Sequence, residues 1–108
     1  MISVIIERDE FDRITSFEMS GHADYAEHGK DLVCAGASAV SFGAVNAVYA
    51  LTKVEPIIEQ GREGGYLKVS FPKTAEDERV QTIIEAMIIA LQTIETDYHE
   101  HIKISQSR

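Results

Sequence analysis

The chain has 108 residues, one cysteine and a formal net charge of −8, with 18 acidic residues against 10 basic ones. One domain, residues 1–108, fits this length, the lone thiol excludes an internal disulfide, and the few scattered Lys and Arg argue against direct nucleic-acid binding. With no basic signal-peptide region and no uninterrupted apolar span, the sequence predicts a cytoplasmic protein without a membrane contact, and its acidity suits a basic partner.

Two strands are predicted at the start of the chain. Residues 2–6 alternate around Ile2, Val4 and Ile6, and residues 14–20 alternate around Phe17 and Met19. The polar residues 8–13 between them predict a hairpin turn. Residues 22–31 show no periodicity, so we expect a loop there.

A helix is predicted over residues 32–51, which are rich in Ala and Val. Asp31 can serve as its N-cap, with the carboxylate accepting from backbone N–H groups two and three positions later. The segment is apolar nearly all round, so we expect it to be central and closely packed. Thr52 to Val54 and Pro56 end it.

The second half of the chain is predicted to hold two strands, a helix and a last strand. Strands are predicted over 56–60 and 66–71, with the turn GREGG (61–65) between them. Thr74 to Asp77 resembles a capping box before an amphipathic helix that extends past Ile94. A last strand is predicted over 101–105.

The predicted order is therefore β-β-α-β-β-α-β. Strands joined by hairpins favour a mostly antiparallel sheet with two helices on one face, an α+β two-layer sandwich. The alternation of Tyr66, Lys68 and Ser70 on the other face, together with the many isoleucines, leaves room for a homodimer surface.

Cys34 is the third residue of the helix that is predicted to begin at Leu32. The positive end of the helix dipole favours a thiolate there, which is the nucleophilic form. Unpaired N–H groups of the first turn could also face a developing oxyanion. A lone cysteine in such a helix can equally be a small core residue.

His22 is the candidate base for this thiol. It follows a strand end and lies 12 residues before Cys34, and the intervening loop can fold back. A cysteine with a histidine on the ends of rigid elements is the general layout of an activated thiol. A histidine in a polar loop can also be a solvated surface residue. No ligand spacing supports a metal site at His22, His28 and Cys34, or at His99 and His101.

Three further residues have supporting roles in this hypothesis. Gly21 would give the loop hinge freedom. Asp31 either caps the helix or orients His22. Ser38 lies one helical turn after Cys34, where it either hydrogen-bonds near the thiol or allows another element to approach closely.

The stretch GHADYAEHGKDLVCAGAS resembles the signature of the ribosomal-processing cysteine protease family. The matching positions are Gly21, His22, Ala23, Gly29, Asp31, Cys34, Ala35 and Ser38. The resemblance extends over the full length of the chain, because members of the family are small and share the predicted order of elements.

The resemblance implies a cysteine endopeptidase that removes an N-terminal extension from a large-subunit ribosomal protein. Cys34 would be the nucleophile and His22 the general base, without a cofactor or a metal, in a homodimer with a mobile loop over the site. It also implies an apolar groove beside Cys34, for which Phe42, Tyr25 and Met19 are candidates. The alternative is a non-catalytic ribosome-assembly module that uses residues 21–31 as a docking surface.

Overall fold

The structure is a computed structural model, and it describes residues 1–21, 31–61 and 65–107. Its elements follow the predicted order, which confirms the α+β fold class. They are β1 (Ile2–Arg8), β2 (Ile14–Ser20), α1 (Leu32–Leu51), β3 (Ile57–Gln60), β4 (Tyr66–Ser70), α2 (Asp77–Tyr98) and β5 (Ile102–Ser107).

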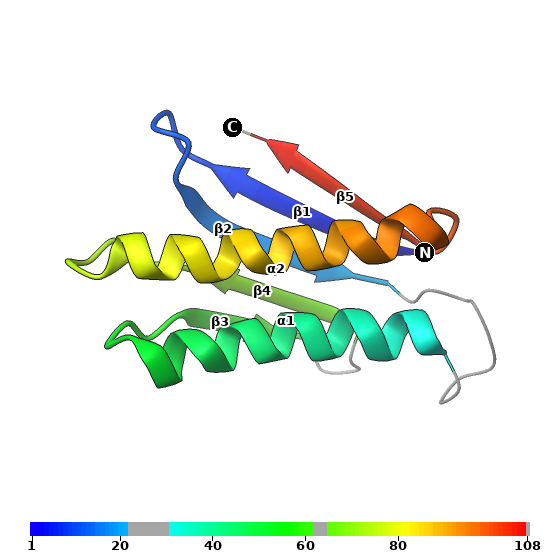
Figure 1. Cartoon of the computed structure of the whole chain (residues 1–108), viewed down its shortest axis with the longest axis horizontal. Coiled ribbons are helices and arrows are strands. Elements are labelled where there is room, and N and C mark those ends of the chain that lie inside the picture. Colours follow the sequence, from blue (N-terminus) through cyan, green and yellow to red (C-terminus); the bar gives the residue numbers. More distant parts are fainter. Residues whose placement is uncertain (22–30, 62–64, 108) are drawn as a thin grey trace.

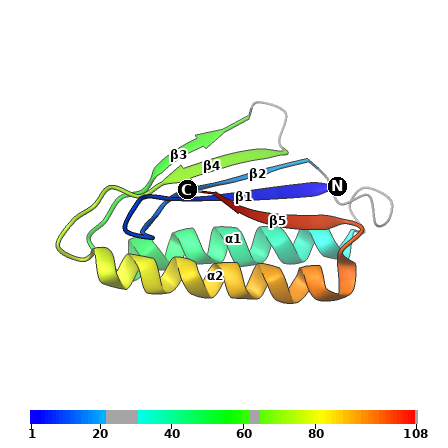
Figure 2. The same cartoon turned by 90° about the horizontal axis from the view of Figure 1, so that it is seen from above.

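The five strands form one sheet in the order β3-β4-β2-β1-β5. β1 and β5 are parallel, and the other neighbouring pairs are antiparallel. The two helices lie side by side on one face of this sheet and leave its other face uncovered (Figures 1 and 2). The sheet is therefore mostly antiparallel, as predicted, and the fold has two layers.

The core lies between the sheet and the helices. In β1, Ile2, Val4 and Ile6 are buried while the residues between them are exposed, because successive side chains of a strand point to opposite faces. Val80 and Ile84 are among the α2 residues that bury their side chains in the same core. Full burial of one such side chain contributes about 1.5–3 kcal/mol.

α1 is buried on one face only, so the expectation of close packing all round is wrong. Its buried residues are Val33, Ala37, Ser41, Val45 and Val48, whereas Phe42 and Tyr49 are exposed. A two-layer fold has no third layer to cover the outer side of a helix. By length and composition α1 could cross a membrane, a test that a helix of a soluble core also passes.

The start of α2 also differs from the prediction. The helix begins at Asp77 rather than after a Thr74 cap, and the Thr74 hydroxyl accepts from the backbone N–H of Glu76 at 3.1 Å. The Asp77 carboxylate pairs instead with Arg13, 2.8 Å away, where both side chains are largely buried. This contact with a residue far away in sequence replaces the capping box.

Candidate active site

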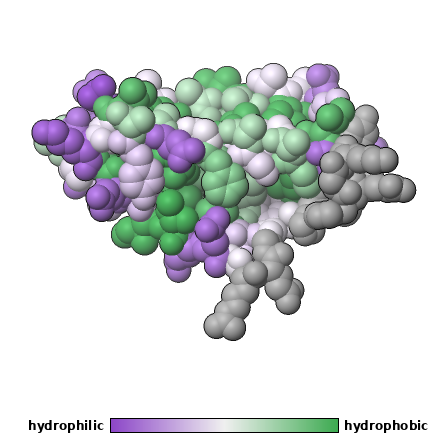
Figure 3. All heavy atoms as spheres, turned by 90° about the horizontal axis from the view of Figure 1, so that it is seen from below, coloured by the Kyte–Doolittle hydropathy of each residue, from purple (hydrophilic) through white to green (hydrophobic). Residues whose placement is uncertain are grey.

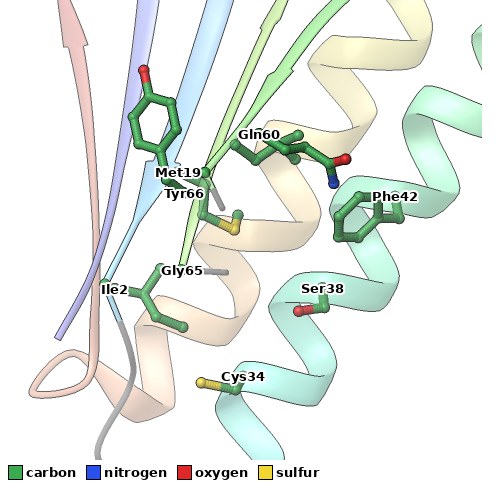
Figure 4. A pocket seen from close by; sticks show the side chains of 11 residues that line it. Ile2, Met19, Cys34, Ser38, Phe42, Gln60, Gly65 and Tyr66 are labelled. Carbon is green, nitrogen blue, oxygen red and sulfur yellow. The ribbon is translucent and has the colours of Figure 1, made fainter. Parts of the chain in front are cut away.

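A pocket of about 370 Å³ lies between the N-terminal half of α1 and the facing strands. Cys34, Ser38 and Phe42 follow one another along the side of α1 that borders it (Figure 4). The sheet side and its turns contribute Ile2, Met19, Gly21, Gln60, Gly61, Gly65, Tyr66 and Leu67. Two of the residues proposed for an apolar groove, Phe42 and Met19, are thus in the lining; Tyr25 is outside the described residues.

Cys34 lies in the first turn of α1 and is half-buried. One side of it packs against the hydrophobic core, and its sulfur points from α1 toward the sheet side of the pocket (Figure 4). The thiol is therefore not sealed in the interior, and a substrate in the pocket can reach it.

Asp31 is the N-cap of α1. Its Oδ1 accepts from the backbone N–H groups of Val33 at 2.9 Å and Cys34 at 3.1 Å, and its carbonyl oxygen accepts from Ala35 at 3.0 Å. The predicted capping role is confirmed. The cap pairs two of the first-turn N–H groups that the sequence left open for an oxyanion, those of Val33 and Cys34. The Ala35 N–H makes the first regular bond of the helix.

This cap predicts that two substitutions of Asp31 will differ in their effect on stability. We expect Asp31→Ala to lower the free energy of unfolding by about 1 kcal/mol, because two N–H groups lose their acceptor. Asp31→Asn should stay close to the wild type, since asparagine caps helices as well as aspartate does. Urea unfolding of both variants measures the difference; equal losses would contradict a capping role.

Ser38 is exposed and lines the pocket one turn after Cys34. Of its two predicted roles, close approach of another element does not fit this position. A hydroxyl beside the thiol does fit, and Figure 4 shows Ser38 and Cys34 pointing toward the same side of α1.

Gly21 links the end of β2 to this pocket. It has a φ of +88°, and a Cβ at this position would collide with the backbone oxygen of Met1. Its N–H donates to the carbonyl oxygen of Gly65 at 2.8 Å, which joins two parts of the pocket lining. Glycine is therefore required at position 21, because both the positive φ and the close approach of Met1 exclude a side chain.

The lining residues that the structure describes include no His, Asp, Glu or Lys. Tyr66 is the other titratable residue of this lining, and a hydrogen bond to Glu18 raises the pKa of Tyr66. Its ring points away from Cys34, so the phenol is not placed to act as the base (Figure 4). His22 is outside the described residues.

Six lining residues were not predicted to be there, namely Ile2, Gln60, Gly61, Gly65, Tyr66 and Leu67. The turn signal at 61–65 placed a loop there, but nothing local indicated that it lies against α1. His99 caps the end of α2 instead of lying in a strand with His101. Within residues 1–21, 31–61 and 65–107, no group of three His, Cys, Asp or Glu could hold a metal.

Comparison with known proteins gives one consistent result. Residues 1–103 match the family model described as cysteine protease Prp. Ribosomal processing cysteine protease Prp of Bacillus subtilis (strain 168) is 48% identical over 108 residues, which is 97% of this chain and 96% of that protein. The protein of the same name from Staphylococcus aureus (strain Mu50 / ATCC 700699) is 44% identical over 105 residues, with coverage of 97% and 98%.

Solved structures agree with these matches. The S. aureus protease Prp in complex with a covalently linked product peptide superposes with a TM-score of 0.93 at 43% identity, covering 99% of this chain and all of that one. Its complex with a substrate peptide gives a TM-score of 0.88 at 40% identity, with the same coverage. A half-buried thiol that opens into a pocket agrees with the chemistry of these relatives. The chain belongs to the ribosomal processing cysteine protease family, Prp.

Proposed function

We propose that this enzyme removes an N-terminal extension from a large-subunit ribosomal protein, with Cys34 as nucleophile and His22 as general base. The observation that carries the proposal is the position of the Cys34 thiol on the wall of the 370 Å³ pocket. The names of the relatives supply the substrate class. The net charge of −8 suits a basic ribosomal protein.

His22 is proposed as the base because of its place in the chain. Gly21 lines the pocket and is held by its contact with Gly65, and His22 is the next residue. Adjacent Cα atoms are about 3.8 Å apart, so an imidazole following Gly21 is within reach of the pocket. The described lining residues offer no competing base.

The proposed reaction has two stages. The Cys34 thiolate attacks the scissile carbonyl carbon and forms a C–S bond, and the His22 imidazolium donates its proton to the leaving amine as the C–N bond breaks. Water then attacks the thioester while His22 takes a proton from it. The C–S bond breaks, which releases the carboxyl product and restores the thiolate and imidazolium.

Ser38 is the proposed donor to the oxyanion, because it lines the pocket one helical turn after Cys34 while the Asp31 carboxylate already accepts from the N–H groups of Val33 and Cys34. We expect Ser38→Ala to lower kcat about 10²-fold with little change in KM, because the hydroxyl would act mainly on the tetrahedral state. Ser38→Thr keeps the hydroxyl and should recover most of the activity. Steady-state kinetics on an extended peptide measure both; a change in KM alone would contradict this role.

We also propose that the enzyme works in the cytoplasm as a homodimer, without a membrane or nucleic-acid contact. The uncovered face of the sheet supports a contact between copies, because Ile5 is 38% exposed there, beside Glu18 of β2 and Ser105 of β5. Sedimentation equilibrium measures the mass. A monomer at the concentrations used for the kinetic assays would refute the dimer.

The substrate is tested directly. The purified enzyme is incubated with a ribosomal protein that carries its N-terminal extension, and the masses of the products are followed. We expect one cut that releases the extension. A ribosomal protein without the extension is the control, and it should stay intact. Binding without any cut would instead support a docking module.

A further inference from the structure

We infer that the outer edge of β3 pairs with the substrate as an additional strand, over Ile58 and Gln60. This inference rests on the proposed function and concerns how the extended peptide reaches Cys34. In the described part of the chain, the sheet ends at β3, whose outer edge has no partner strand.

The hydrogen-bond register determines which backbone groups face outward. The N–H of Gly61 donates to Tyr66 at 3.2 Å, and β3 pairs with β4 in antiparallel register. In such a ladder the residues that bond to the neighbouring strand alternate with residues that do not. Gly61 and Glu59 therefore face β4, and Ile58 and Gln60 direct their N–H and C=O groups to the outer edge.

The edge is closed at the end away from Cys34. Pro56 has no N–H, and its carbonyl oxygen accepts from the Tyr49 hydroxyl of α1 at 3.4 Å. At the other end, Gln60 lines the pocket together with Cys34 (Figure 4). The open backbone groups thus lead to the rim of the pocket that holds Cys34.

β3 also exposes apolar side chains along its edge. Natural edges are commonly guarded by charge, proline or a bulge. Pro56 and Glu59 give β3 some of this protection, but Ile57 is 57% exposed and Ile58 is 41% exposed. Figure 3 looks onto the side where α1 and β3 lie, and apolar side chains gather there. An extended peptide would cover them and place alternate side chains toward Phe42.

A basic peptide fits this edge better than a second copy of the chain does. Glu59 in β3 and the net charge of −8 suit a basic peptide, and the proposed contact between copies uses the uncovered face of the sheet instead. The substrate already places its scissile bond in the pocket, so the same peptide can continue from the pocket along β3. Pairing along an edge gives affinity through the main chain and accepts varied side chains.

The test compares Ile58→Pro with Ile58→Ala. Both remove most of the side chain, but only proline removes the outward N–H, and edge positions tolerate proline. We expect kcat/KM on an extended peptide to be about fivefold to tenfold lower for proline than for alanine. Gln106→Pro and Gln106→Ala are the matched control pair on the opposite edge, where the register with β1 also turns N–H outward. Both lose the hydrogen bond that Gln106 accepts from Arg8 at 2.9 Å, so their activities should be alike.

Amide exchange gives a second measurement that needs no proline variant. In Cys34→Ala, added peptide should slow exchange at Ile58 and Gln60 more than tenfold, and at Glu59 much less. Equal activity of the two Ile58 variants, or bound peptide without this protection, overturns the inference. Protection that rises with protein concentration alone would assign the edge to a second copy and also overturn it. If the wild type does not cut, the proposed function fails instead.

Discussion

Cys34→Ala is expected to lower the cleavage rate by at least about 10⁴-fold, because the thiol is the strongest nucleophile among the described groups on the pocket wall and the Ser38 hydroxyl has no described base in that lining. Cys34→Ser should lose nearly as much, since a hydroxyl is far less acidic than a thiol. The measurement is the rate of release of the extension under single-turnover conditions.

The fold should survive this substitution. Cys34 is half-buried, and removing one sulfur from the edge of the core should cost about 1 kcal/mol. Cys34→Ala should therefore still bind an extended peptide with the affinity of the wild type. Because the chain has one cysteine, alkylation by iodoacetamide gives an independent readout: one carbamidomethyl group should remove all activity. Cleavage by Cys34→Ala at the wild-type rate would rule out the nucleophile assignment.

Local patterns were sufficient to predict every element of the fold. Alternation placed β1 and β2, and the apolar face around Ile84 and Ile88 placed α2. They could not predict the sheet order, because periodicity says which face of a strand is buried and nothing about its neighbour. The parallel pairing of β5 with β1 is such a case. The Arg13–Asp77 pair is another, since it joins residues far apart in sequence.

For the candidate site, too, the sequence predicted the local features but not the contacts between distant segments. The N-cap at Asp31 and the first-turn position of Cys34 follow from local sequence. Two consequences do not. The cap takes up two of the N–H groups that were expected to hold the oxyanion, a competition that depends on the side-chain rotamer of Asp31. Gln60 reaches the pocket only because β3 folds back beside β4.

The Asp31 cap also changes the electrostatics expected at the thiol. A carboxylate oxygen 3.1 Å from the Cys34 nitrogen places negative charge where the helix dipole is positive. The dipole is thus partly offset at the start of α1, and the proposed mechanism relies on His22 for the positive charge beside the nucleophile. This makes the histidine more important than the helix position alone suggests.

His22→Ala is accordingly expected to lower kcat about 10³-fold, because the reaction loses both the partner of the thiolate and the proton donor to the leaving amine. His28→Ala is the matched control, a second histidine of the same stretch that the mechanism does not use, and it should keep nearly full activity. Thermal unfolding of both variants checks that the fold is retained.

Rescue by free imidazole then separates chemistry from structure. If His22 supplies a proton-transfer group, added imidazole should raise the rate of His22→Ala in proportion to its concentration and leave Cys34→Ala inactive. A histidine with a purely structural role would show no such recovery. Equal losses in His22→Ala and His28→Ala would likewise contradict the assignment, since only one of the two residues directly follows Gly21 at the pocket.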